Sequence, residues 1–186
     1  MAPKVKVTRE DIVKAAIELV RVHGERAINA REIAGALNCS TQPIFTNFAT
    51  MGDLRIAVID AAMVLSDQYM KTEVESGRYP TYKATGMAYI RFAKEEKELF
   101  KLLYMRDRTE EQVADDKELS DGMMEIIRKH TGLDEERAKM FHLEMWAVVH
   151  GIATMFITGY VKLEWELVSR MITDVYQGLK KQYGGE

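Results

Sequence analysis

The sequence predicts an all-α protein, because apolar residues recur at three- and four-residue spacing almost throughout and no segment alternates as a strand does. Only three prolines and twelve glycines interrupt the 186 residues, so few positions favour turns. Apolar residues make up 47% of the chain and charged residues 30%, which is ordinary for a folded protein with a solvated surface. The length suits one large domain, or a small domain joined to a larger one.

The first helix is predicted to begin after Thr8 and to end at Gly24. Asp11 lies three positions after Thr8, in the spacing of a capping box, and glycine commonly ends helices because it adopts left-handed backbone conformations. Four apolar residues at helical spacing are expected to face inward: Ile12, Ala16, Leu19 and Val20.

A second helix is predicted over residues 30–37, with Asn29 as its N-cap, and a third helix follows with Ser40 as its cap. Pro43 falls in the first turn of the third helix, where its missing N–H costs little. The inward-facing positions on these two helices are Ile33, Ala34, Leu37, Ile44 and Phe48. Two short helices joined by a tight turn, with a supporting helix before them, make a helix-turn-helix, which places its last helix in the major groove of DNA.

Uncharged polar residues cover the outer side of the third helix, at Thr41, Gln42, Thr46 and Asn47. Side-chain amides such as those of Gln42 and Asn47 pair with adenine in a major groove, so this surface suits base recognition. The plainer interpretation is that these are ordinary surface side chains. The charge distribution is compatible with DNA binding, since the first 55 residues hold eight Lys and Arg against six Asp and Glu, whereas the whole chain has a net charge of −3.

The rest of the chain predicts further helices. A long helix is expected from about Asp53 past Tyr69, and Gly77 and Pro80 break it. Others are expected over residues 82–94, 97–105, 118–130 and 165–179, and Asp134 is expected to cap a long helix that reaches about Tyr160.

The single cysteine excludes an internal disulfide, so a reducing cytoplasm is the expected location. The N-terminus has lysines but no apolar run behind them, which argues against a secretory signal peptide. The most apolar segment, residues 145–157, is shorter than the roughly 18 to 20 residues of a membrane span and contains His150. A helix buried on several sides explains this segment better, and no membrane association is expected.

The segment from Thr8 to Leu54 resembles the DNA-binding head of the tetracycline-repressor (TetR) family of bacterial transcription regulators. The resemblance rests on the first helix with its glycine, followed by "REIAGALN", "ST", "IF", "NF" and "DL" at the spacing of that family. Trp146, His150 and Gly151 resemble a W-x-x-x-H-G signature that is found in one C-terminal class of the family.

This resemblance implies two domains, a helix-turn-helix DNA-binding domain over residues 1–52 and a helical effector-binding and dimerisation domain over residues 53–186. It implies a ligand-responsive regulator, most often a repressor, that binds a palindromic double-stranded DNA operator as a homodimer. A dimer suits this function because two heads about 34 Å apart meet successive major grooves. A small, largely apolar effector would release the DNA.

The family's DNA-contacting positions correspond to Arg31 and to a set on the third helix: Thr41, Gln42, Pro43, Phe45, Thr46 and Asn47. Lys4, Lys6 and Arg9 would extend this surface as a basic arm. Three positions depart from the family pattern: Phe45 replaces a phosphate-binding tyrosine, Asn47 a frequent histidine, and Met51 a lysine that reaches the DNA backbone. Because phosphate contacts supply most of the salt-dependent affinity, these departures favour weaker operator binding, or a head that has lost it.

The last two helices are expected to pack against their copies in a second subunit, as the resemblance implies. The apolar positions predicted at this interface are Val149, Phe156, Trp165, Val168, Ile172, Val175 and Leu179. The alternative is that this face covers the protein's own core, and both can hold because a helix has two flanks.

Methionine and aromatic residues are numerous, with twelve methionines, eight tyrosines and six phenylalanines, and many fall on the middle helices. Thioethers and aromatic rings make an adaptable wall for an apolar ligand, although any helical core also contains them. With the resemblance, the predicted effector pocket comprises Tyr89, Phe92, Tyr104, Met124, Phe141, Met145, Trp146 and His150.

The sequence fits two other classes of protein less well. An enzyme is not expected, because the sequence has no Gly-rich phosphate loop, zinc-protease motif or nucleophile elbow. No cofactor is implied. His142, Trp146 and His150 are spaced to share one face of a helix, but two histidines eight positions apart do not suit one metal ion. The alternative to a regulator is a helical ligand-binding or interaction protein with a weakened or vestigial DNA-binding head, which Phe45 and Met51 favour.

Overall fold

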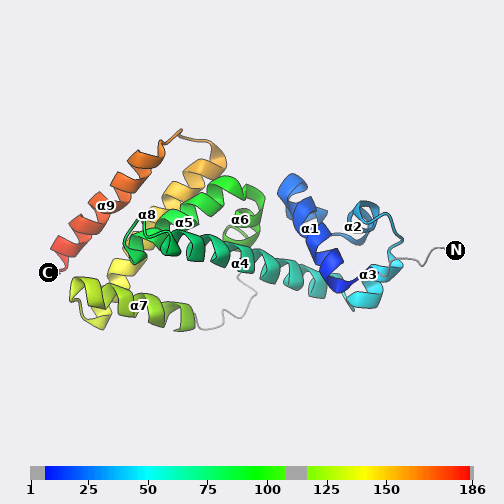
Figure 1. The fold of residues 1–186 in the computed structure, drawn as a ribbon, viewed down its shortest axis with the longest axis horizontal. Coiled ribbons are helices and arrows are strands. Elements are labelled where there is room, and N and C mark those ends of the chain that lie inside the picture. The colour runs from blue at the N-terminus through cyan, green and yellow to red at the C-terminus, as the bar shows by residue number, and fades with distance from the viewer. Residues whose placement is uncertain (1–6, 108–116, 185–186) are drawn as a thin grey trace. The chain divides into compact units, whose positions relative to one another are not determined.

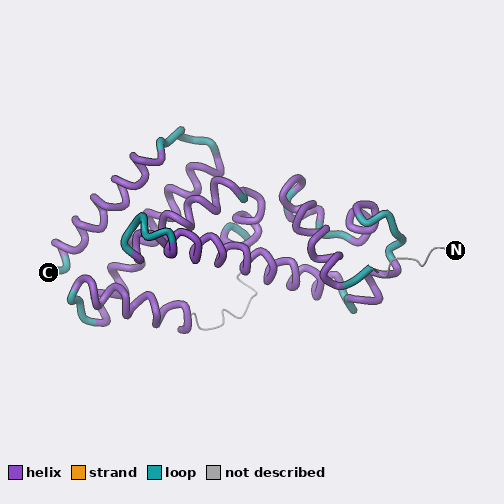
Figure 2. The backbone as a smooth tube through the Cα atoms, in the orientation of Figure 1, coloured by secondary structure: helices purple, strands orange, loops and turns teal. Residues whose placement is uncertain are grey.

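The computed structural model describes residues 7–107 and 117–184, and these residues form helices joined by short loops, with no strand among them (Figure 1; Figure 2). The all-α prediction is confirmed. The chain divides into two compact units, which we call the head unit (Met1–Asp67 with Glu96–Arg106) and the body unit (Gln68–Glu95 with Asp107–Glu186). This division follows packing contacts, and the functional boundary predicted at residue 52 stays a prediction.

Helix α1 (Arg9–His23) opens the head unit and has the predicted ends. The backbone N–H of Asp11 donates to Thr8 Oγ1 at 3.1 Å, and the backbone N–H of Thr8 donates to Asp11 Oδ2 at 3.0 Å, which completes the capping box. Gly24 ends the helix with a φ of 74°, a conformation that favours glycine. Of the four residues expected to face inward, Ile12, Ala16 and Val20 are buried and Leu19 is half-buried.

A short 3-10 helix, η1 (Glu25–Ala27), leads to α2 (Ala30–Ala36) and α3 (Gln42–Asn47). Asn29 caps α2 as predicted, since its side chain accepts from the backbone N–H of Glu32 at 3.0 Å. The prediction that Ser40 caps α3 is wrong, because the N-cap is Thr41 and no side chain caps this helix. The backbone of Thr41 is already helical, with φ −71° and ψ −13°, rather than extended as in a capping residue.

Helix α4 (Met51–Glu75) begins two residues before the predicted start. Thr50 and Asp53 exchange hydrogen bonds there, from the Asp53 backbone N–H to Thr50 Oγ1 at 3.1 Å and from the Thr50 backbone N–H to Asp53 Oδ2 at 2.9 Å. The helix belongs to the head unit up to Asp67 and to the body unit from Gln68. It therefore links the two units covalently.

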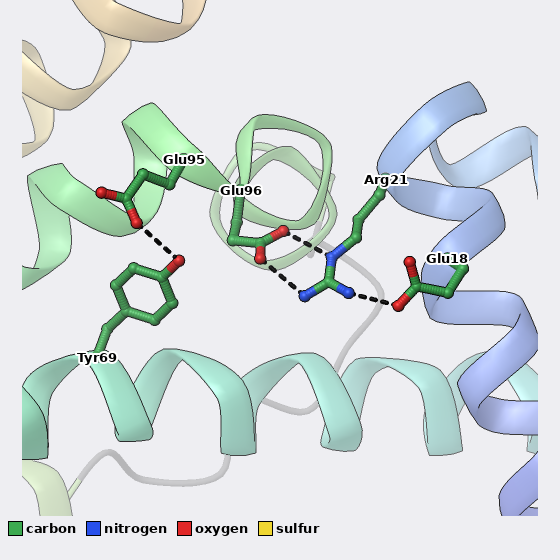
Figure 3. A network of polar contacts seen from close by, with 5 residues as sticks. All are labelled: Glu18, Arg21, Tyr69, Glu95 and Glu96. Atoms are coloured by element: carbon green, nitrogen blue, oxygen red, sulfur yellow. Dashed lines mark hydrogen bonds and ion pairs between the residues drawn. The ribbon is translucent and has the colours of Figure 1, made fainter.

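Helix α6 (Lys97–Tyr104) belongs to the head unit and packs on α1. The Arg21 guanidinium makes two hydrogen bonds to the carboxylate of Glu96, at 2.9 Å and 2.7 Å, and also pairs with Glu18 (Figure 3). These hydrogen bonds, which Arg21 donates to Glu96, hold the pKa of Arg21 above its ordinary value. This two-pronged contact fixes the start of α6 against α1.

The body unit contains α5 (Thr81–Glu95), α7 (Lys117–Thr131), α8 (Glu135–Thr158) and α9 (Trp165–Gln182), close to the predicted ranges. Helix α8 packs against each of the other three, and α5 also contacts α7 and α9. Asp134 caps α8 by accepting from the backbone N–H of Arg137 at 2.9 Å, and Gly159 ends it with a φ of 66°.

By length and composition alone, α8 is apolar enough to cross a membrane, although the sequence analysis expected no such segment. Five of its apolar residues are buried between Met145 and Ile157: Met145, Val149, Ile152, Ala153 and Ile157. Its packing on three helices gives it the position of a core helix, which passes the same test of length and hydropathy.

Candidate nucleic-acid interface and effector site

Helix α3 is anchored to the head unit through Ile44, which is fully buried, and Phe48, which is 3% exposed. Its outer side carries Gln42, Phe45 and Thr46, all exposed. Three of the predicted DNA-contacting residues are half-buried, Thr41, Pro43 and Asn47, and Arg31 on α2 is exposed. The predicted contact residues of α2 and α3 therefore lie on a helix pair whose inner side is fixed by aliphatic and aromatic packing.

Hydrogen bonds within the head unit occupy two of the polar side chains. The Asn47 amide donates to the carbonyl of Pro43 at 2.8 Å and to the carbonyl of Val7 at 3.4 Å. Thr46 Oγ1 donates to the carbonyl of Gln42 at 2.9 Å. Asn47 therefore fastens α3 to the segment that leads into α1, and its N–H groups are engaged inside the protein.

Gln42 differs from Asn47 although the sequence analysis treated the two amides alike. The side chain of Gln42 is exposed, and it makes no hydrogen bond within the described ranges. Its amide offers one donor group and one acceptor in the arrangement that matches the edge of adenine. Of the two amides on α3, Gln42 is the one that is available to an external partner.

In the described part of the head unit, few of the positions predicted to contact phosphates carry a cation. Phe45 is 54% exposed and has no hydroxyl to offer, and Met51 is half-buried at the first position of α4. The Arg9 guanidinium lies over the Phe48 ring at 4.1 Å and donates to the carbonyl of Asn47 at 3.2 Å. Lys4 and Lys6 lie outside the described residues. Arg9 and Arg31 are both exposed, but Arg9 is engaged with Phe48 and Asn47, so Arg31 is the exposed charge among the predicted contacts on α2 and α3.

The predicted effector residues do not all belong to one unit. Tyr104 lies in the head unit, where its hydroxyl is 3.0 Å from Ser66 Oγ and burial raises its pKa. The other seven lie in the body unit: Tyr89, Phe92, Met124, Phe141, Met145, Trp146 and His150. All of these except Trp146 and His150 are buried, so they are core side chains within the protomer.

Two tyrosine–histidine pairs cross between α5 and α8. The Tyr82 hydroxyl is 3.0 Å from His142 Nδ1, and the Tyr89 hydroxyl is 2.9 Å from His150 Nδ1. Burial lowers the pKa of both histidines and raises that of Tyr82, so the neutral forms are favoured. The sequence analysis placed the two histidines on one face of a helix but missed Tyr82, which lies sixty positions away.

Aromatic rings surround these pairs. Trp146 stacks on the His150 ring, with centroids 5.0 Å apart and planes 17° apart. The Phe141 ring packs near the rings of Tyr82 and Tyr176, with ring centroids 6.2 Å and 5.3 Å apart, respectively. Trp146 is 47% exposed, so one end of this aromatic and polar array reaches the surface of the body unit.

The residues predicted at a dimer interface have two environments. Val149, Val168 and Ile172 are buried within the single chain, and Phe156, Trp165, Val175 and Leu179 are half-buried. The first three therefore fill the protomer's own core, which is the alternative that the sequence left open. Exposed apolar side chains on α8 lie elsewhere on that helix, at Met140, Leu143 and Trp146.

Within the described ranges, no group of three or more His, Cys, Asp or Glu side chains is arranged to hold a metal ion. The fold and the exposed polar helix together define a helix-turn-helix protein with a separate helical body.

Comparison with known families shows which family this chain belongs to. The family model described as the C-terminal domain of tetracyclin repressor-like proteins matches residues 82–175, just over half of the 186 residues. The chain therefore belongs to the TetR-like family, whose members are ligand-responsive, DNA-binding transcriptional regulators. A search of curated proteins finds no significant match.

Solved structures share the fold. A TetR-like transcriptional regulator from Rhodococcus sp. RHA1 aligns over 91% of this chain and 93% of its own, with a TM-score of 0.68 at 13% identity. A TetR family member from Streptomyces coelicolor A3 aligns over 90% and 96%, with a TM-score of 0.63 at 19% identity. The multidrug binding protein EbrR, in complex with imidazole, aligns over 90% and 93%, with a TM-score of 0.61 at 18% identity.

Proposed function

We propose that this protein is a cytoplasmic transcriptional repressor that binds a palindromic operator as a homodimer and is released by a small, largely apolar effector. The observation that carries this proposal is Gln42, an exposed and uncommitted amide on α3, held outward by the buried Ile44 and Phe48. Family membership supports DNA binding, small-molecule binding and dimerisation as general properties.

Base recognition in this proposal depends on Gln42, with Thr41 and Thr46 at its sides. Asn47 supports α3 rather than reading a base, because its amide donates to the carbonyls of Pro43 and Val7. Arg31 supplies a phosphate contact, and Lys4 and Lys6 would add others from the N-terminal segment.

Selection of binding sites from random DNA tests this assignment. The Gln42→Ala variant should lose preference at one position per half-site, equivalent to about 1–3 kcal/mol. The matched control is Gln182→Ala, an exposed glutamine at the end of α9, which should select the same sites as the parent protein. If the Gln42→Ala variant kept the parent's preference at every position, α3 would not be the reading helix.

Dimerisation in this proposal uses the outer faces of α8 and α9. Leu143 on α8 is 56% exposed and Leu167 on α9 is 36% exposed, whereas Val168 and Ile172 are already buried in the protomer. Leu143→Glu should therefore give monomers in analytical ultracentrifugation without loss of helix content. Lys129→Glu, at an exposed position of α7, should leave the dimer intact. A dimeric Leu143→Glu variant would exclude this face.

The effector is proposed to bind beside the tyrosine–histidine pairs, where Trp146 and His150 are only partly covered. The signal would pass to the head unit through α4, which belongs to both units, and through the α5–α6 junction at Glu95 and Glu96. A shift of α4 would change the separation of the two heads of a dimer, so that their spacing no longer matched successive grooves.

A second candidate function is a helical ligand-binding protein with a vestigial head. The absence of a hydroxyl at Phe45 and of a cation at Met51 favours it, since both positions would otherwise contact phosphates. Loss of operator binding by a folded dimer would separate this candidate from the repressor.

A further inference from the structure

The body unit contains a cavity that the proposed functions do not use. Its volume is about 240 Å³, and it is lined by Arg78, Arg91, Lys94, Glu95 and Trp165. Arg78 follows α4, the next three residues belong to α5, and Trp165 is the first residue of α9. Two neighbouring segments of the chain and the distant start of α9 therefore build one small, cation-rich site.

Arg91 is held in position by a buried carboxylate. Its Nη1 atom is 2.8 Å from Oε2 of Glu73, whose side chain is 2% exposed. The other carboxylate oxygen, Oε1, is buried and has no hydrogen-bond partner within the described residues. The Arg91 guanidinium also lies over the Trp165 ring, at 5.3 Å from the centroid. A fixed Arg–Trp pair therefore forms part of the cavity wall.

Trp165 has an unused donor. Its indole Nε1 is buried, and no acceptor among the described residues reaches it. Buried donors without a partner are rare in folded proteins, because they have lost water and gained nothing in return. An oxygen atom of a ligand in the cavity would supply the missing acceptor.

The remaining charges favour an anion. Lys94 and Arg78 are exposed, and neither forms an ion pair in the part of the chain that the structure describes. Glu95 is the one acidic residue in the lining, and its Oε2 atom already accepts from the Tyr69 hydroxyl at 3.0 Å (Figure 3). With Arg91 balanced by Glu73, the lining presents two cations against one partly engaged carboxylate.

We propose that this cavity binds a small molecule through a carboxylate or phosphate group. The oxygens of that group would accept from the indole N–H of Trp165 and pair with Arg78 and Lys94. The volume is below the roughly 300–1,000 Å³ of pockets for drug-sized ligands, so the ligand is a small acid or phosphate. The Trp165 ring already lies against the protein's own cations, because Arg91 and Lys94 are 5.3 Å and 5.7 Å from its centroid. Charge and hydrogen bonding, rather than stacking on this ring, therefore provide recognition of the ligand. This inference does not depend on DNA binding.

The test uses Trp165 as the reporter. The chain has two tryptophans, so Trp146→Phe leaves Trp165 alone. Its fluorescence is titrated with sodium phosphate and, separately, sodium acetate, at ionic strength held constant with sodium chloride. A saturable change with phosphate alone identifies a phosphate ligand, and one with acetate alone or with both identifies a carboxylate-accepting site.

The double variant Arg78→Gln with Lys94→Gln, in the same background, should weaken binding at least tenfold, whereas the control Lys129→Gln should bind as the parent does. Isothermal titration calorimetry on the protein with both tryptophans provides the same comparison if Trp146→Phe fails to fold. The proposal is overturned if neither anion binds saturably to folded protein, or if the double variant binds as tightly as the control.

Discussion

The head unit and the body unit are stabilised by different kinds of contact. In the head unit, aliphatic side chains such as Ile12, Val20 and Ile33 form the core, and the side-chain hydrogen bonds at helix ends join residues three positions apart. In the body unit, tyrosine–histidine hydrogen bonds between residues sixty or sixty-one positions apart lie among aromatic rings. Local signals therefore set the helix ends of the head, where Arg21 and Glu96 are a distant pair that joins α1 to α6. In the body, distant polar pairs lie within the aromatic core.

The largest expected effect is in the body core. Phe141 is fully buried and contacts two tyrosine rings, so Phe141→Ala should lower the free energy of unfolding by about 3–5 kcal/mol. Urea unfolding followed by circular dichroism measures this loss. Lys139→Ala, at an exposed position of the same helix, should change it by less than about 0.5 kcal/mol. Equal effects of the two variants would mean that Phe141 is not a core residue.

The next effect concerns the contact between α1 and α6 in the head unit. Arg21→Met removes the two hydrogen bonds to Glu96, which is 13% exposed, and should cost about 1.5–3 kcal/mol. Glu18→Gln, which removes a 59% exposed carboxylate from the same arginine, should cost less than about 1 kcal/mol. A larger loss for Glu18→Gln than for Arg21→Met would contradict the role assigned to Glu96.

A smaller effect is expected at the first helix cap. Thr8→Ala should destabilise the protein by about 1 kcal/mol, because the backbone N–H of Asp11 loses its acceptor. Hydrogen bonds from Thr8, first from its backbone N–H and then from its hydroxyl, lower the pKa of Asp11. The variant should therefore raise that pKa toward its ordinary value, as followed by NMR titration. An unchanged pKa would show that the Thr8 hydroxyl does not donate to the Asp11 carboxylate.

The smallest effect is a pH dependence in the body unit. Burial lowers the pKa of His142 below the ordinary value of 6.5. Below pH 6.5 the unfolded chain therefore binds a proton that the folded chain does not, and the free energy of unfolding falls as the pH falls. His142→Gln should reduce this acid-side slope, and His130→Gln, at an exposed position of α7, should keep it. Identical slopes in the two variants would exclude His142 as the group responsible.

The sequence predicted the helices and the starts of α1, α2 and α8, because Thr8, Asn29 and Asp134 act on neighbours three positions away. It also predicted Ile44 and Phe48 as the anchors of α3. Periodicity did not indicate that Asn47 would be engaged internally while Gln42 stayed free, since both occupy the outer side of a short helix. That distinction depends on Val7, forty positions from Asn47.

The body was less predictable for the same reason. His142 and His150 were assigned to one helix face, but their partners Tyr82 and Tyr89 lie on another helix, and no local pattern joins them. The cavity beside Trp165 depends on Arg78 after α4, on residues of α5 and on the start of α9, and Glu73 of α4 holds Arg91 in place. Trp165 itself was assigned to a dimer seam from its spacing, and within its own chain it packs near the cations of α5.

The most direct measurement is binding of the purified protein to the DNA upstream of its own gene, titrated at low and moderate salt, beside the Met51→Lys variant. A repressor should bind a short palindrome saturably, with affinity that falls as salt rises, and Met51→Lys should tighten binding and steepen the salt dependence by about one phosphate contact. If the folded dimer bound no better than it binds non-specific DNA, and Met51→Lys changed nothing, the head would be vestigial and the repressor account would be wrong.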